Sequence, residues 1–148
     1  MKTILVAIEN IDALTLSSPI VERTMELAKA LASKVWLVHV VPRLGTTPFT
    51  VPREALRDGA ATELHHEHRR MQKVTTLLRE HGIDASALLI EGTTVKTLLQ
   101  EADRLHADLI VLGYHSHSLF YRALLDGTGE RLLNESRYPL LFVPEPPA

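Results

Sequence analysis

The alternation of short aliphatic runs with longer amphipathic stretches is the feature that most constrains the fold of this chain. The runs have strand length and are rich in β-branched and aliphatic residues, as in strands buried on both faces. The stretches between them carry apolar residues at helical spacing. This order predicts an α/β domain with a parallel sheet and helices on both faces. The predicted strands are Thr3–Ile8, Val35–Val41, Ala85–Ile90, Asp108–Leu112 and Leu140–Val143.

Turn and cap residues mark the predicted helices. Ser18 suits an N-cap, and Pro19 suits the first helical position. Gly82 suits the residue that follows a helix end. Proline, glycine and threonine predict a loop at Arg43–Asp58. The other predicted segments are a helix from about Arg53 or later to Glu80, a helix capped by Thr93 or Thr94, a loop over Gly113–Gly129 and a last helix beginning within Glu130–Glu135.

Length and composition narrow the class of protein. A chain of 148 residues suits one domain, residues 1–148, and its 45% hydrophobic and 23% charged residues are ordinary for a globular protein. The net charge of −2 and the lack of a long basic run argue against nucleic acid or a membrane surface as partner. The absence of cysteine excludes disulfides and thiol nucleophiles. We expect a cytoplasmic protein, because no apolar run reaches membrane-spanning length.

The predicted topology also predicts where a ligand would bind. Parallel α/β sheets bind ligands outside the carboxyl ends of their strands, where the strand order reverses. The loop Gly113–Gly129 follows such an end and is the expected place for small-molecule chemistry. No GxGxxG follows the first strand and no GxxxxGK[ST] is present, which argues against dinucleotide-binding and P-loop proteins.

The segment Asp108–Pro144, DLIVLGYHSHSLFYRALLDGTGERLLNESRYPLLFVP, resembles the C-terminal signature of the universal stress protein family. ILVAIE resembles the family's first strand with its acidic end, LVHVV the second strand, and IEG the junction before a capped helix. The resemblance covers the whole chain. It implies an open five-stranded parallel sheet in a Rossmann-like, three-layer sandwich.

Nucleotide-binding members of that family carry Gly-x2-Gly-x9-Gly-[Ser/Thr], and this chain matches the pattern in part. Gly113 fits the first position, and Ser116 stands where the second glycine belongs. Without a gap, Asp126 and Gly127 occupy the final pair; a one-residue insertion places Gly127 and Thr128 there instead. The ungapped register keeps the last strand in phase and is the preferred one, although both remain open.

The register decides how well a phosphate would be tolerated. A phosphate charge 4 Å from the Asp126 carboxylate costs about 4 kcal/mol at an effective dielectric of about 20. That energy corresponds to roughly a thousandfold loss of affinity. Mg²⁺ or Mn²⁺ between carboxylate and phosphate would reverse the effect, and so would Asp126 turning away to cap the last helix. The glycines of Gly127–Gly129 still offer backbone donors at a helix entrance.

The resemblance implies that an adenine nucleotide, ATP or AMP, lies across the carboxyl edge of the sheet. No catalytic residue or metal-ligand set is assigned, since no general base or nucleophile is evident and any ATP hydrolysis would be slow. His65, His66 and His68 lie on the predicted long helix, where His65 and His68 share one face and a metal site is conceivable, but a solvated polar face is the favoured interpretation. The implied nucleotide-binding residues are Ala7, Glu9, Val40, Gly113, His115, Ser116, His117, Asp126, Gly127, Thr128 and Gly129.

The predicted last strand bears on the oligomeric state of the protein. A terminal strand at Leu140–Val143 forms a sheet edge, and apolar edges invite pairing. The resemblance implies a homodimer through this strand, in a stress-response protein with an unidentified regulatory partner. Ser116 and Asp126 keep a second hypothesis open: a dimeric protein-interaction module with a degenerate site that binds no nucleotide.

Overall fold

The computed structural model describes residues 2–9, 11, 14–41, 53–92, 94–114 and 137–146; for residues 41, 53–65, 94 and 114 it describes the backbone alone. Strands and helices alternate up to the fourth strand, as the sequence predicts. None of the helices in these ranges is long and apolar enough to cross a membrane. The elements are β1 (Thr3–Ala7), α1 (Pro19–Leu31), β2 (Lys34–Val41), α2 (Arg53–Glu80), β3 (Ala85–Glu91), α3 (Thr94–Leu105), β4 (Leu109–Tyr114) and β5 (Leu140–Pro144).

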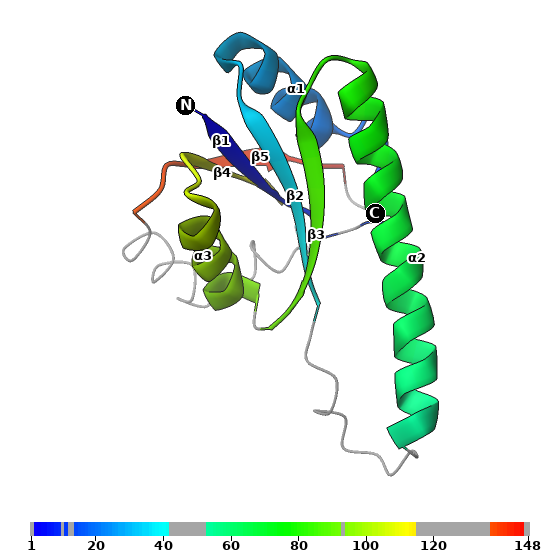
Figure 1. Cartoon of the computed structure of the whole chain (residues 1–148). Coiled ribbons are helices and arrows are strands. Elements are labelled where there is room, and N and C mark those ends of the chain that lie inside the picture. Colours follow the sequence, from blue (N-terminus) through cyan, green and yellow to red (C-terminus); the bar gives the residue numbers. More distant parts are fainter. Residues whose placement is uncertain are drawn as a thin grey trace.

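The five strands form one parallel sheet in the order β3-β2-β1-β4-β5, which confirms the predicted fold class (Figure 1). β1 lies in the centre, where Ala7 pairs with Val38 of β2 and with Leu112 of β4. The chain adds β2 and β3 on one side of β1 and then crosses to add β4 and β5 on the other side. The strand order therefore reverses between β1 and β4.

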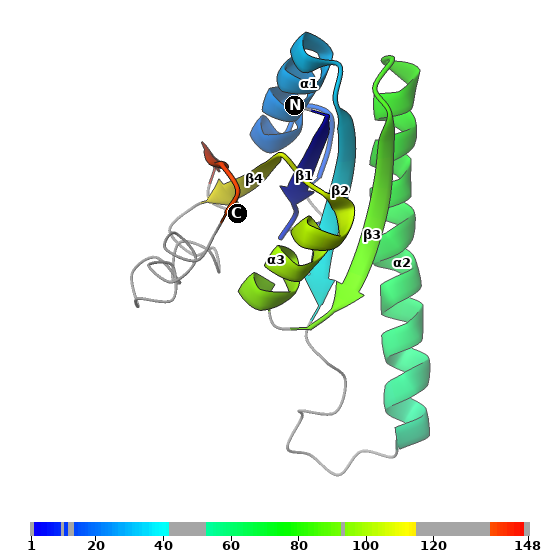
Figure 2. The same cartoon turned by 60° about the vertical axis from the view of Figure 1, so that its left-hand side comes forward.

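Helices cover both faces of the sheet and make it a three-layer structure (Figure 2). α1 and α2 lie on one face, and α3 lies on the other. The alternation of side chains along each strand divides the apolar residues between the two cores. The α1/α2 core includes Ile4, Val6, Val35, Leu37, Met71, Leu78 and Val111, and the α3 core includes Leu5, Val38, Leu98, Ala102, Ile110 and Leu112.

The start of α1 is capped by a residue that the sequence pattern did not identify. Ser18 is the N-cap in backbone conformation, but its side chain caps no helical N–H. Its Oγ instead accepts a hydrogen bond from the Thr15 N–H at 3.0 Å. The Ile20 N–H, in the first turn, donates to Oε1 of Glu145 at 3.1 Å. A carboxylate is favourable there because the helix dipole leaves partial positive charge at the N-terminus.

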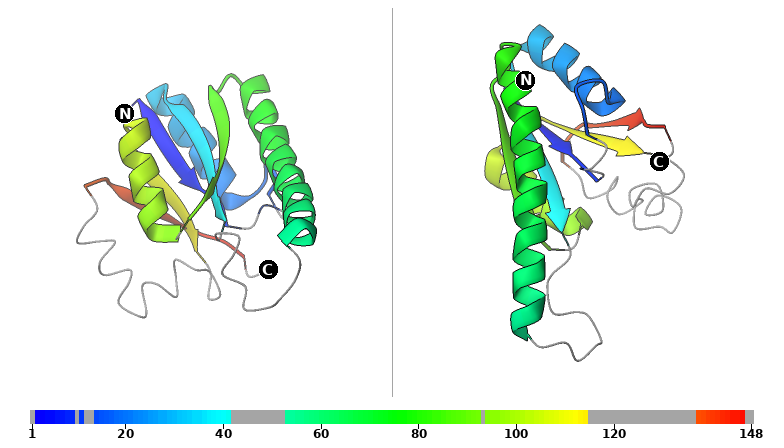
Figure 3. Two further views of the ribbon diagram at one scale, coloured as in Figure 1. Left: turned by 60° about the horizontal axis from the view of Figure 1, so that its bottom comes forward. Right: turned by 90° about the vertical axis from the view of Figure 1, so that its right-hand side faces the viewer.

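α2 begins at Arg53, the earliest start in the predicted range. Because the residues after Pro52 are helix formers, the end of the predicted loop Arg43–Asp58 is helical from Arg53 onward. The helix ends as predicted: Gly82 has φ +81°, which suits glycine, and the Ile83 N–H donates to the Leu78 carbonyl at 3.1 Å. The amino-terminal end of α2 extends beyond the carboxyl edge of the sheet (Figure 3).

β4 is longer than predicted and corrects the start of the Gly113–Gly129 loop. Gly113 and Tyr114 continue the strand and pair with Val143 and Pro144 of β5. The prediction ended at Leu112 because a glycine in sequence is a turn signal, whereas here the neighbouring strand supplies the pairing. The rest of that loop and the predicted last helix lie outside the described residues.

Candidate functional site

The carboxyl edge of the sheet at β1 and β4 is the candidate site, because the strand order reverses there. The register brings three predicted residues to this edge. Ala7 ends β1, Gly113 follows the Leu112 that pairs with Ala7, and Val40 lies two residues beyond the Val38 that pairs with Ala7. The three come from separate parts of the sequence and share one end of the sheet.

The residues at this edge lie on different faces of the sheet. Ala7 is 5% exposed and packs in the α3 core, against which Val40 also packs. Gly113 lies on the opposite face, next to Ile20 of α1. Glu9 lies just after the end of β1 and is half-buried. A ligand on this edge would therefore meet small or aliphatic groups on one face and backbone on the other.

His39 fixes the end of β1 from the α2 side. Its Nδ1 lies 2.7 Å from the carbonyl oxygen of Ile8. Since a carbonyl only accepts, Nδ1 carries the proton in this contact. Nε2 lies 3.7 Å from Oε2 of Glu67, a buried oxygen without a hydrogen-bond partner among the described residues. The bond from His39 to the Ile8 carbonyl holds the backbone directly before Glu9.

Gly113 is a close-approach position, and its neighbour is Glu145. A Cβ on Gly113 would lie 3.1 Å from Cγ and 3.3 Å from Cδ of Glu145, and 3.4 Å from Cδ1 of Ile20. The same carboxylate accepts the Ile20 N–H. The sequence pattern gave no sign of Glu145, because a contact that joins positions 20, 113 and 145 leaves no local signal.

The remaining histidines of the described helices make local contacts. His66 accepts a hydrogen bond from Nε of Arg70 at 3.3 Å, and His68 lies 3.0 Å from the Gln72 amide. No group of three metal-ligating side chains occurs among the described residues. The favoured interpretation of a polar helix face agrees with these contacts; the side chain of His65 is outside the described set.

The model of the universal stress protein family matches residues 1–144. This chain belongs to the universal stress protein family. Universal stress protein MJ0531 of Methanocaldococcus jannaschii is 26% identical over 127 residues, which are 84% of this chain and 73% of that protein.

Solved structures agree with the fold. The universal stress protein of Archaeoglobus fulgidus in complex with dAMP has a TM-score of 0.62 at 15% identity, covering 97% of this chain and 98% of its own. A universal stress protein family protein of Arabidopsis thaliana with AMP bound has a TM-score of 0.57 at 18% identity, covering 99% and 93%. At these identities the likeness supports the fold alone.

The universal stress protein glycine pattern is described only at its first position. Gly113 is in place at the end of β4. The other predicted residues of the loop lie outside the described residues: His115, Ser116, His117, Asp126, Gly127, Thr128 and Gly129. The register of Asp126, Gly127 and Thr128 against the pattern therefore stays a prediction.

Proposed function

We propose that this universal stress protein binds an adenine nucleotide, ATP or AMP, at the carboxyl edge of β1 and β4. The observation that carries the proposal is the strand register, which gathers Ala7, Val40 and Gly113 at the point where the strand order reverses. Relatives of this fold solved with dAMP and AMP support the choice of ligand. The protein acts as a nucleotide-responsive stress protein rather than as an enzyme.

The described residues supply the base and ribose end of the site. Ala7 ends β1 at this edge and brings its backbone groups there, and Val40 offers an apolar wall and backbone groups. The Glu9 carboxylate can accept hydrogen bonds from ribose hydroxyls. The predicted loop after Tyr114 contributes the phosphate donors, from Gly127 to Gly129.

Charge decides whether phosphate is accepted. The Glu145 carboxylate beside Gly113 adds to the negative charge that Asp126 contributes in the ungapped register. Carboxylates and phosphates repel unless a cation lies between them. Mg²⁺ or Mn²⁺ suits that role, since both prefer oxygen ligands from carboxylates and phosphates. The proposal therefore includes a divalent cation for ATP.

Calorimetric titration with AMP and with ATP, each with and without Mg²⁺, tests the proposal. We expect binding in the micromolar range and a higher affinity for ATP in the presence of Mg²⁺.

Glu9→Gln should lower the affinity for both nucleotides about tenfold, because it removes a charged hydrogen-bond acceptor. Glu22→Gln, on exposed α1 surface, is the matched control. Asp126→Gly should tighten binding if the ungapped register is right.

The alternative is a protein-interaction module without a nucleotide. Glu145 favours it, because it fills the space beside Gly113 that a ligand would otherwise approach. Mass spectrometry of ligand released from the denatured, purified protein separates the two. Adenine nucleotide in the released fraction contradicts the module. A lack of released nucleotide, with no heat from either titration at high micromolar concentration, contradicts nucleotide binding.

A further inference from the structure

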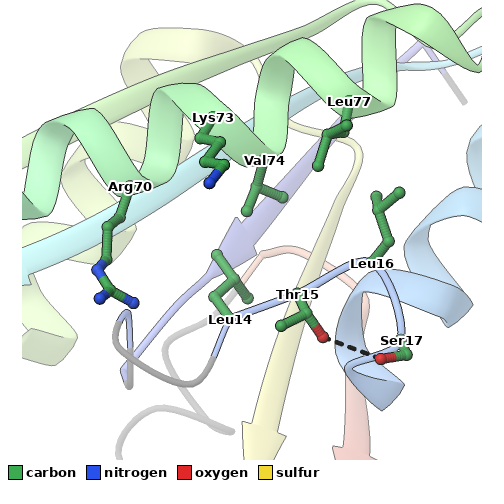
Figure 4. Close-up of a pocket in the computed structure, with 8 residues that line it drawn as sticks. All are labelled: Leu14, Thr15, Leu16, Ser17, Arg70, Lys73, Val74 and Leu77. Atoms are coloured by element: carbon green, nitrogen blue, oxygen red, sulfur yellow. Dashed lines mark hydrogen bonds between the residues drawn. The ribbon is translucent and has the colours of Figure 1, made fainter.

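A cleft of about 600 Å³ lies between α2 and the segment that leads into α1. Its size is within the range of small-molecule pockets. Of the predicted nucleotide-binding residues, the four that the structure describes, Ala7, Glu9, Val40 and Gly113, do not line it. The lining residues are Leu14, Thr15, Leu16, Ser17, Arg70, Lys73, Val74 and Leu77 (Figure 4).

The walls of the cleft are aliphatic. Leu14 and Leu16 extend from the segment before α1, and Val74 and Leu77 extend from α2 toward them (Figure 4). The described lining residues include no aromatic side chain on which a base could stack. These walls suit a saturated hydrocarbon group better than a nucleobase.

One end of the cleft is positively charged. Arg70 and Lys73 lie about one helical turn apart on α2, and both side chains extend toward the facing segment (Figure 4). Arg70 to Leu77 covers about two helical turns, or about 10 Å. The cleft thus runs from a cationic end to an aliphatic end over roughly that length.

Arg70 and Lys73 differ in their hydrogen-bond partners. Nε of Arg70 donates to His66. Within the described part of the chain, the Lys73 ammonium has no ion pair or hydrogen bond. The Thr15 and Ser17 hydroxyls lie 3.0 Å apart and are paired with each other. Lys73 is therefore the group with capacity for a new partner.

We propose that this cleft binds a small carboxylate with a saturated hydrocarbon chain. The carboxylate pairs with Lys73 at the cationic end, and the chain lies between the aliphatic walls. We propose it as a second site, because Ala7 and Val40, at the base end of the proposed nucleotide site, lie on the α3 face of the sheet while Val74 belongs to the α1/α2 core.

Titration of the full chain with sodium octanoate tests this proposal, with octylammonium and acetate as comparisons. Octanoate should bind, and each buried methylene should add about fourfold in affinity, so acetate should not bind measurably. Octylammonium should bind at least tenfold more weakly than octanoate, because its charge is opposite. Methyl resonances of Val74 and Leu77 should shift on addition of octanoate.

Variants of Lys73 locate the carboxylate. Lys73→Gln should weaken octanoate binding about three- to fivefold, as for an exposed ion pair, and Lys73→Glu should weaken it further. Lys73→Arg should restore binding. Arg69→Gln removes the same charge from an exposed position of α2 that does not line the cleft, and should leave affinity within about twofold.

Several outcomes overturn the proposal. The proposal is wrong if octanoate does not bind at millimolar concentration, if octylammonium binds as tightly as octanoate, or if Lys73→Glu leaves the affinity for octanoate unchanged. Competition between AMP and octanoate would overturn the independence of the two sites. Octanoate binding in a protein that binds no nucleotide would support this cleft and contradict only the proposed function.

Discussion

At the residue scale, Gly113 has two competing explanations. A glycine at this place in the family pattern lets a phosphate approach the backbone. In the structure it also makes room for Glu145, whose carboxylate caps α1. The two explanations predict different results for the same substitution, because one concerns ligand affinity and the other concerns stability.

Gly113→Ala should lower the free energy of unfolding by about 1 kcal/mol, because the added methyl group displaces Glu145 and weakens its bond to Ile20. Denaturant unfolding measures the loss. In a Glu145→Ala background the same substitution should cost less, so a double-mutant cycle gives a coupling energy. Strictly additive effects would contradict the contact, and a loss of nucleotide affinity without a loss of stability would favour the phosphate explanation.

Asp108 joins the starts of β1 and β4. Its Oδ2 accepts the backbone N–H of Lys2 at 2.8 Å and that of Thr3 at 3.0 Å. Hydrogen bonds from Lys2 and Thr3 stabilise the charged form and hold the pKa of Asp108 below its ordinary value of 3.8. A lowered pKa in the folded state stabilises the protein above the unfolded pKa, and this stability is lost as pH falls through the folded pKa.

Asp108→Asn should therefore lower the melting temperature at neutral pH. The difference from the natural chain should shrink as pH falls from about 5 to about 2, because the carboxylate is then protonated in both states. Thermal unfolding over that range measures it. Asp84→Asn, at an exposed position before β3, is the control. A difference that stays constant with pH would mean that the Asp108 charge contributes nothing.

Residue-scale contacts were the least predictable from sequence. The glycine pattern of the family predicted Gly113 as a site residue. Glu145 and Glu67 were missed because their partners lie far away along the chain. Hydrogen bonds and close approaches of that kind arise from the tertiary fold and have no period or spacing in the sequence.

At the element scale, β5 has the position that the sequence predicts. It pairs with β4 on one side and forms the edge of the sheet on the other. Leu140 and Leu141 are half-buried rather than fully covered by the described residues. Exposed apolar edges promote association, and we propose that two copies of this chain pair through β5.

Leu140→Lys should convert the homodimer to a monomer, since lysines on edge strands oppose pairing. Light scattering at micromolar concentration should give twice the protomer mass for the natural chain and a single protomer mass for the variant. Ser86→Lys, on the opposite edge strand β3, is the control and should stay dimeric. A natural chain that is already monomeric would contradict the dimer.

Strands and helices were predicted well where hydrophobic periodicity and turn or cap residues indicated the same element. The aliphatic runs correctly predicted all five strands, and Gly82 correctly predicted the end of α2. The errors lie at boundaries that pairing decides, such as the extension of β4 through Gly113 and Tyr114. A glycine favours a turn only when no neighbouring strand is available to hold it extended.

At the scale of the whole molecule, alternation of strands and helices was enough to predict a parallel three-layer fold. Alternation does not fix the order of strands in the sheet; the pairing of β1 with both β2 and β4 does. The place where a ligand binds depends on that order. The sequence predicted the location of the candidate site as the loop Gly113–Gly129, and the structure describes the residue that begins this stretch, Gly113, at the carboxyl edge shared by β1 and β4.

The central position of β1 has a consequence for how the chain is made. β1 and β2 can pair soon after they leave the ribosome, but the other side of β1 waits for β4, since Ile4 pairs with Leu109. During that interval the most buried strand of the sheet is an open apolar edge. Such edges recruit other chains, so nascent chains are the stage most exposed to aggregation. Slow synthesis of the middle of the chain would prolong that stage.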